Sequence, residues 1–227
     1  TALAANTTAS NNVAIGSYAM DASTTGANNT AVGTLALTTN TTGANNIAMG
    51  YGALASNSTG ANNVALGNSA LTQSTTASEN VAVGYAALYD NTTGQLNTAV
   101  GSNALRYNTT GTSNTAMGRL ALYVNVGGGY NSSYGMNSLK SNTSGNYNVA
   151  LGYEALQANT SGTSNTAVGM YSGKFTTTGQ GITAIGYSAL NANTTASYNT
   201  AVGYQALTSN TTGGQNVAVG FQALTDN

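Results

Sequence analysis

One 17-residue pattern runs through the whole chain and limits what the chain can fold into. The segment NTAVGYQALTSNTTGGQ, residues 199–215, shows the pattern clearly. Its opening Asn, which we call position 1, recurs once in every repeat without a change of step, with Ile182 in one of these places. The other recurrences are Asn12, Asn29, Asn46, Asn63, Asn80, Asn97, Asn114, Asn131, Asn148, Asn165, Asn199 and Asn216. A strict period of this length is typical of a solenoid, in which each repeat forms one coil and stacks on the next.

The repeat defines the domain organisation that we expect. We predict a single repeat array over residues 1–227, made of twelve full repeats at 12–215 and partial repeats at 1–11 and 216–227. Because both partial repeats stop inside the pattern, we expect the sequence to be a window on a longer fibre.

Positions 2 to 4 of each repeat predict a short strand. Position 3 is Ala except at Ser133, position 4 is bulky and nearly always apolar, and position 5 is always Gly. Side chains alternate between the two faces of a strand, so positions 2 and 4 share one face and position 3 occupies the other. We expect position 4 to point into the coil and Ala to point out. Glycine at position 5 suits a sharp turn that a residue with a Cβ would not adopt.

The second half of the repeat predicts another short strand and a second turn. Leu stands at position 9 except at Met20 and Gly173, and we expect it to point inward. A helix over A-L-x-x-N is the competing interpretation, but the Gly, Thr and Asn content disfavours it. The predicted fold is therefore all-β: a parallel β-solenoid with one coil per 17-residue repeat and two short strands per coil. Asn amides and Thr hydroxyls should bond to the same side-chain groups one coil above and below.

The Ala column at position 3 is a candidate association face. Each coil has only two or three large apolar side chains, worth about 1.5 to 3 kcal/mol each on burial, whereas ordering each backbone residue costs roughly 1 to 2 kcal/mol. Stacking, and lateral association with another chain or sheet, would have to supply the rest. The alternative is that a narrow coil simply requires a small residue at this position. The candidate residues are Ala14, Ala31, Ala48, Ala65, Ala82, Ala99, Ala116, Ala150, Ala167, Ala184, Ala201 and Ala218.

Composition argues against several functional classes. Charged residues are 4% of the chain, against about 25% in ordinary soluble domains, and four Lys or Arg residues cannot displace counterions along a nucleic acid. The chain has no Cys and no His, so we predict no disulfide, no metal site of ordinary ligand type, no cofactor and no enzymatic activity. No apolar run is long enough for a membrane-spanning helix, and we predict no membrane insertion.

The motif N-x-A-V-G-Y-x-A-L, present as NTAVGYQAL at residue 199 and NVAVGFQAL at residue 216, supports a comparison with known repeats. It resembles the repeats of phage and bacterial tail-fibre proteins, and also the N-S-V-A-I-G strand and turn of trimeric autotransporter adhesin (YadA-like) heads. The resemblance covers the whole chain and implies a left-handed, often trimeric β-roll that projects from a virion or a cell to touch a surface. The 17-residue period is longer than the adhesin-head repeat.

From this resemblance we expect a structural, non-enzymatic fibre or adhesin shaft, located extracellularly at a cell or virion surface. We expect self-association as a homotrimer or a filament, with a surface glycan or a cell-surface receptor as a further partner. A self-assembling surface filament is one alternative. An ice-binding β-solenoid that uses its Thr columns is another, although positions 13 and 14 would face opposite ways in an extended strand.

Position 10 provides a candidate surface-contact column in six consecutive coils, and it holds three of the four cationic residues. Because Leu at position 9 should point inward, position 10 should point outward. Alternating rings and cations could pair by cation–π contact and bind a sugar or an acidic group, or they could merely cover the strand. The six residues are Tyr89, Arg106, Tyr123, Lys140, Gln157 and Lys174.

Two further features have open interpretations. The N-T-T, N-S-T and N-T-S triplets are glycan acceptors in a eukaryotic secretory route, or turns with stacked amide and hydroxyl columns. The coils at 131–147 and 165–181 depart from the pattern, through neutral variation or through a local kink or contact. The acceptor asparagines are Asn6, Asn40, Asn57, Asn91, Asn108, Asn142, Asn159, Asn193 and Asn210.

Overall fold

The computed structural model describes residues 1–225, which contain 13 strands of three residues and no helix. The chain divides into two compact units, Thr1–Ser113 with β1 to β6 and a second unit that begins at Asn114 with β7 to β13. The first six strands are Val13–Ile15, Thr30–Val32, Ile47–Met49, Val64–Leu66, Val81–Val83 and Thr98–Val100. The other seven are Thr115–Met117, Ser132–Tyr134, Val149–Leu151, Thr166–Val168, Thr183–Ile185, Thr200–Val202 and Val217–Val219.

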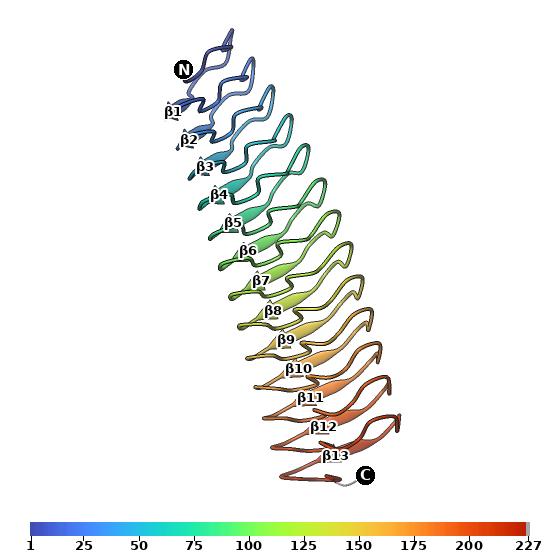
Figure 1. Cartoon of the computed structure of the whole chain (residues 1–227). Coiled ribbons are helices and arrows are strands. Elements are labelled where there is room, and N and C mark those ends of the chain that lie inside the picture. Colours follow the sequence, from blue (N-terminus) through green and yellow to red (C-terminus); the bar gives the residue numbers. More distant parts are fainter. Residues whose placement is uncertain (226–227) are drawn as a thin grey trace. The chain divides into compact units, whose positions relative to one another are not determined.

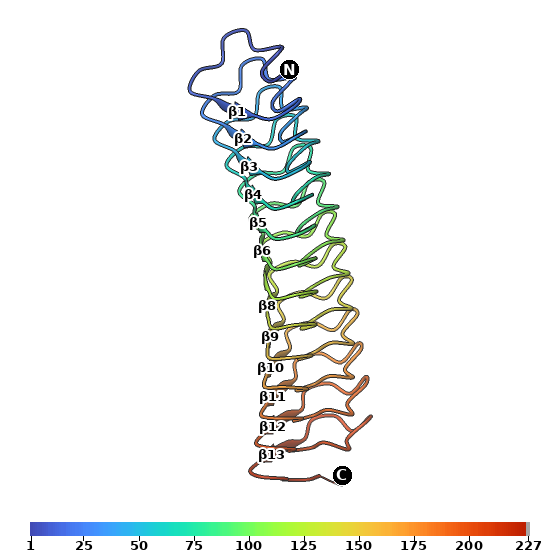
Figure 2. The ribbon, with the colours of Figure 1, turned by 60° about the vertical axis from the view of Figure 1, so that its left-hand side comes forward.

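Within each unit the strands pair in parallel and in sequence order (Figures 1 and 2). Each residue pairs with its equivalent in the next repeat, as Ala14 does with Ala31 in β1 and β2. In the second unit Ala167 pairs with Ala184 in the same way. Equivalent positions therefore stack directly on one another, which confirms the parallel β-solenoid with one coil per repeat.

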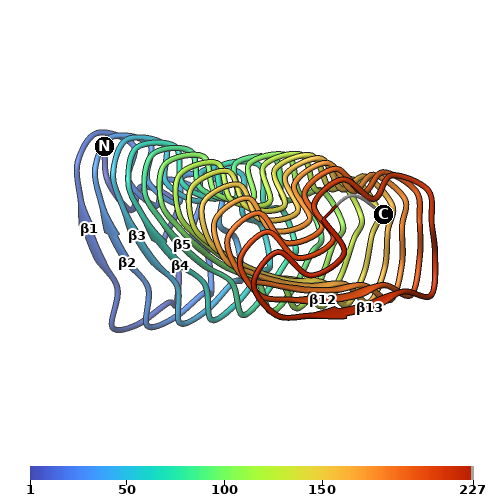
Figure 3. The ribbon, with the colours of Figure 1, turned by 90° about the horizontal axis from the view of Figure 1, so that it is seen from below.

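Each coil contains one strand, so the prediction of a second strand in the second half of the repeat is wrong. That half of the coil is built of turns, and its outline bends repeatedly in Figure 3. Residues at positions 7, 9 and 17 have φ between +47° and +64°, including Leu88 at +52°, whereas a strand needs negative φ. A left-handed backbone conformation at Leu costs on the order of 1 to 2 kcal/mol. Burial of the Leu side chain stabilises the fold by about 1.5 to 3 kcal/mol, which offsets this cost.

The strand faces the opposite way from our prediction. In β5 the central Ala82 is fully buried, and Val81 and Val83 on either side lie on the outer face. Leu88, at position 9, is also fully buried, as predicted. The interior is narrow because Leu, a second Ala at position 8 and two Asn side chains already occupy it. Only a small side chain, Ala or in one coil Ser, stands between them and the strand, and the bulky position 4 points outward.

The Ala column is therefore not an association face. Every Ala of this column from Ala31 to Ala201 is fully buried inside its own coil, Ala218 is nearly so, and Ala14 is half-buried. None of the buried members can contact another chain while the coil stays closed. The small size of position 3 is the steric requirement of a thin coil, which was the alternative interpretation.

Two buried asparagine columns link the coils. Asn29 Nδ2 at position 1 and Asn40 Nδ2 at position 12 both donate to the carbonyl oxygen of Gly43, each at 2.9 Å. Asn29 Oδ1 accepts from the backbone N–H of Asn46 in the next coil at 2.9 Å. Asn57 Nδ2 donates to Asn40 Oδ1 at 2.8 Å. These bonds satisfy polar groups in the buried interior, which confirms that amide columns bond from coil to coil.

The irregular coil at 131–147 holds a compensating pair of substitutions. Ser133 and Ser138 replace the two buried Ala residues of positions 3 and 8, and their hydroxyl groups hydrogen-bond to each other. Ser133 Oγ also lies 2.9 Å from the Ser138 carbonyl oxygen, and Ser138 Oγ 2.9 Å from the Gly135 carbonyl oxygen, so the hydroxyl hydrogen that is not used between the two serines has a backbone acceptor. One buried hydroxyl group would require a partner, and the second serine provides it.

Candidate functional site

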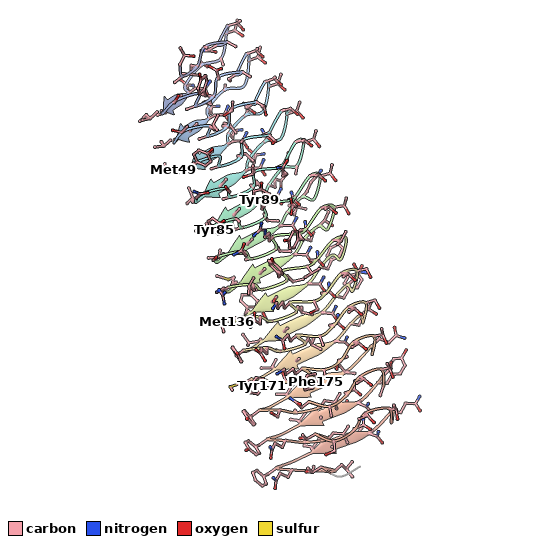
Figure 4. The ribbon with its side chains drawn as sticks, viewed as in Figure 1. Met49, Tyr85, Tyr89, Met136, Tyr171 and Phe175 are labelled. Carbon is pink, nitrogen blue, oxygen red and sulfur yellow. The ribbon has the colours of Figure 1, made fainter. Side chains whose placement is uncertain are left out.

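The position-10 column lies on the surface of the coils, as predicted. All six residues are half-buried, with Tyr89 and Arg106 in the first unit and the other four in the second. Figure 4 labels Tyr89 together with Tyr171 and Phe175, two rings that flank the column in the second unit. Because the six residues belong to two units, we describe the cationic members of each unit in turn.

Arg106 is held by two rings and an amide. Its Cζ lies 5.5 Å from the centroid of the Tyr89 ring one coil earlier and 5.3 Å from that of Tyr107. Its Nη1 donates to Asn103 Oδ1 at 2.9 Å. The predicted cation–π contact between successive coils is therefore present at Tyr89 and Arg106. These contacts hold the guanidinium group against the two rings and the amide.

Lys174 is held in a similar way by a carboxylate. Its Nζ lies 2.9 Å from Glu154 Oε2, and 4.8 Å and 5.0 Å from the ring centroids of Tyr171 and Phe175. Burial raises the pKa of Glu154, but the hydrogen bonds from Lys174 and Tyr153 outweigh it, so the pKa is lowered overall. The hydrogen bond to Glu154 raises the pKa of the Tyr153 hydroxyl group.

Sequence reasoning missed Glu154 as the partner of this column. Glu154 stands at position 7 of its coil, and Lys174 stands at position 10 of the following coil. The same step, of 20 residues, joins Thr72 Oγ1 to the Gly52 carbonyl oxygen and Asn191 Nδ2 to the Tyr171 carbonyl oxygen. Position 10 thus contacts position 7 of the preceding coil, a relationship that a search for opposite charges at this spacing would have found.

The outer face of the strands presents exposed apolar side chains in each unit. Positions 2 and 4 both point outward, so their aliphatic side chains lie side by side on successive coils (Figure 4, where Met49 is labelled). Ile15 is 60% exposed and Leu151 48% exposed. The position 2 residues are Thr, Ser, Val or Ile, and no charged residue occurs at either position. Contiguous exposed apolar side chains on a sheet face can mark an interaction site.

The turn at positions 13 and 14 has a different surface. Thr24 Oγ1 donates to the Thr41 carbonyl oxygen of the next coil at 3.0 Å, and Thr41 Oγ1 donates to that of Ser58 at 3.0 Å. The hydroxyl groups of Thr24 and Thr41 thus bond to the backbone of the next coil and not, as predicted, to the same side-chain group one coil away. Their neighbours at position 14, such as Thr25 and Thr42, are exposed. Because this segment is a turn, both positions reach the surface together instead of facing opposite ways.

The glycan-acceptor asparagines mostly lie inside the coils. Asn40, Asn57 and their equivalents through Asn193 are fully buried, Asn210 is nearly so, and Asn6 is exposed. Their amide nitrogens donate to position 15 carbonyl oxygens, as Asn91 Nδ2 does to Gly94 at 2.9 Å. The structure therefore supports the interpretation of these triplets as turns with stacked amides.

Residues 1–225 contain no group of three or more His, Cys, Asp or Glu side chains that could hold a metal ion. The same residues include no helix that is long and apolar enough to cross a membrane. Comparisons with protein-family models, with curated proteins and with solved structures found no match. The resemblance to tail-fibre and adhesin-head repeats therefore remains a prediction from the motif.

Proposed function

We propose that this chain forms a structural, non-enzymatic segment of an extracellular fibre or adhesin shaft, in which copies associate through the outer faces of their strands. One observation supports the proposal above all: the side chains of positions 2 and 4, most of which are Val, Ile, Leu or Met, point outward and are left partly in water. Burying them against a partner would contribute about 25 cal/mol of favourable free energy for each Å² of apolar surface.

A second copy of this chain is the partner that fits this face best. The face repeats one pair of positions at every coil, at a strand spacing of about 4.8 Å. A partner must then present apolar groups at the same spacing over the same length, and the same face of another copy does so. The absence of charge at positions 2 and 4 means that two such faces would not repel each other. A trimer or a filament would both satisfy this requirement.

The oligomeric mass in solution tests the proposal. Met49→Lys with Leu66→Lys places two charges on the outer strand face of adjacent coils, and Thr42→Lys with Thr59→Lys places two charges on the turn as a matched control. We expect the native chain and the control to form the same oligomer in sedimentation experiments, and the strand-face variant to be a monomer. A native chain that is monomeric at high concentration would rule the proposal out.

Surface attachment by the position-10 column is the second element of the proposal. The Tyr89 ring is half-buried and already accepts a cation, Arg106, so it can also present its free edge to a sugar or an acidic group. Tyr89→Ala with Tyr123→Ala should weaken binding to an array of neutral and acidic glycans, without a large change in thermal stability. Tyr51→Ala with Tyr85→Ala is the control for loss of exposed rings. Equal binding by both double variants would contradict the proposal that the position-10 column attaches to a surface.

Ice binding is a second candidate function, because positions 13 and 14 both lie at the surface of the turn. The bond from each position 13 hydroxyl group to the next coil holds that side chain in one orientation, and a rigid, regular row of methyl and hydroxyl groups is suited to ordering water. The two lysine variants separate the candidates. Thr42→Lys with Thr59→Lys would abolish thermal hysteresis if the turn binds ice, whereas Met49→Lys with Leu66→Lys would preserve it. No thermal hysteresis in the native chain would exclude ice binding.

A further inference from the structure

Pairs of tyrosines stack on adjacent coils of the second unit. The ring centroids of Tyr130 and Tyr147 are 5.2 Å apart with an interplanar angle of 13°. Those of Tyr187 and Tyr204 are 5.2 Å apart with an angle of 14°. In each pair the residues are one repeat apart and occupy the same position of the pattern, so the two phenol groups extend from the backbone in the same direction.

Both pairs are open to solvent. Tyr130 and Tyr147 are 57% and 61% exposed, and Tyr187 and Tyr204 are 40% and 46% exposed. The stacked arrangement brings ring carbons next to the hydroxyl group of one tyrosine close to the equivalent carbons of the other. Exposure lets a dissolved oxidant reach the phenols and gives the rings room to turn as a bond forms. The backbone hydrogen bonds between coils, such as that from Gln205 N to the Tyr187 carbonyl oxygen at 2.8 Å, hold the pair in place.

We propose that these two pairs are sites of oxidative dityrosine cross-linking between adjacent coils. The oxidant is a peroxidase with hydrogen peroxide, or another one-electron oxidant. Each phenol gives up one electron and one proton to become a phenoxyl radical. The two radicals join through ring carbons next to their oxygens, and those carbons then pass their protons to the phenol oxygens. Overall, two tyrosines and one hydrogen peroxide yield one dityrosine and two waters.

Such a bond would be a covalent staple in a chain that cannot form a disulfide, because it has no cysteine. It would close a loop as long as one repeat and tie one coil to the next. Closing a loop of this size restricts the unfolded chain, as a disulfide does. We therefore expect oxidation of the native chain to raise the midpoint of thermal unfolding by about 5 °C or more. The site is independent of whether copies of the chain associate.

The test is oxidation of the dilute native chain by a haem peroxidase and hydrogen peroxide. Dityrosine fluorescence should appear, and peptide mass spectrometry should find the 130–147 and 187–204 links, each with the loss of two hydrogens. Tyr147→Phe and Tyr204→Phe keep the ring stack and remove the phenol, and each should abolish its own link. Tyr51→Phe and Tyr85→Phe are controls, because neither ring contacts another ring within residues 1–225. The Tyr204–Phe221 stack, at 5.3 Å, should yield no dityrosine.

Three results would overturn the proposal. The first is an unchanged dityrosine yield in the Tyr147→Phe, Tyr204→Phe double variant. The second is a number of dityrosines per chain that rises with protein concentration, which would place the links between molecules and not between coils. The third is the absence of dityrosine from the folded native chain under conditions that cross-link free tyrosine.

Discussion

Ile182 occupies the space that a leucine side chain at Gly173 would need. A Cβ on Gly173 would lie 3.5 Å from Ile182 Cδ1 and 3.1 Å from Leu156 Cδ2. Gly173 stands where other coils have Leu, and Ile182, almost fully buried, stands where they have Asn. These two departures from the repeat therefore compensate for each other in volume, much as Ser133 and Ser138 compensate for each other in hydrogen bonding.

The first prediction concerns this exchange. Gly173→Leu alone should destabilise the chain by about 1 to 3 kcal/mol, because it overfills the site. Ile182→Asn alone should also destabilise it, because it removes an apolar side chain and leaves a gap beside Gly173. The double variant restores the regular pattern at both positions and should be more stable than either single variant. Chemical denaturation would measure the coupling energy, and additive effects would contradict the prediction.

The second prediction concerns a break in the position 12 amide column. Asn57 Oδ1 and Ser74 Oγ are buried and have no hydrogen-bond partner within residues 1–225. Ser74→Asn with Ala77→Gly restores the N-T-T-G turn of neighbouring coils and supplies an amide donor to Asn57. We expect a gain of about 1 kcal/mol in the free energy of unfolding. Ala77→Gly alone is the control, and no gain over it would show that the break has no energetic cost.

The third prediction concerns the glycine of position 5. Gly84 has φ of +130°, and a Cβ there would lie 2.8 Å from the carbonyl carbon of Gly101 in the next coil. Gly84→Ala should cost at least about 2 kcal/mol, because the alanine would be strained and would also push the coils apart. Gly52 has φ of +62° with no atom within 4 Å of the added Cβ. Gly52→Asn should therefore be nearly neutral, and a similar loss in both variants would contradict the explanation.

The fourth prediction concerns pH. The lowered pKa of Glu154 means that its ion pair with Lys174 stabilises the fold above the ordinary Glu pKa and is lost as the pH falls through the folded-state value. The raised pKa of Tyr153 stabilises the fold below the ordinary Tyr pKa and is lost as the pH rises through the folded-state value. With no His in the chain, stability should be flat between these limits.

Thermal melts of the native chain and of Glu154→Gln across the pH range would test this. The variant should lose the acid-side dependence, because it removes the carboxyl group that titrates, and most of the alkaline dependence, because the hydrogen bond to Glu154 is the main cause of the raised Tyr153 pKa. Lys140→Gln, which changes a charge elsewhere on the same column, should leave the profile unchanged. A pronounced change in stability near neutral pH would contradict the prediction.

The period of the sequence was enough to predict the coil, the parallel pairing and the register, because a repeat stacked on itself leaves only one in-register arrangement. It was not enough to predict which way the strand faces. Alternation groups positions 2 and 4 but does not say which face is inside, and hydrophobicity favoured Val83 over Ala82. The width of the coil determines which face of the strand points inside, and that width follows from the buried Leu and Asn side chains across the coil.

The second half of the coil was beyond a pattern-based prediction for another reason. Leu88 in a left-handed conformation contradicts its intrinsic preference, and only contacts with neighbouring coils make that conformation favourable. The surface column was easier to predict. Outward placement of Tyr89 and Lys174 followed from their position beside the buried Leu or its replacement, but the pairing of Lys174 with Glu154 depends on the offset between coils.

The buried amides of the N-T-T turns make sugar attachment and coil closure mutually exclusive. An oligosaccharide on Asn57 would have to sit where Gly60 and Asn40 now receive its amide hydrogens. In a eukaryotic secretory compartment, glycosylation of the open turn by the transferase would therefore compete with folding of the coil, which buries the acceptor asparagine. A coil that is glycosylated before it folds could not close, and its stacking on the neighbouring coils would be interrupted. Expression of the chain in such a host would read out, site by site, how quickly each coil closes.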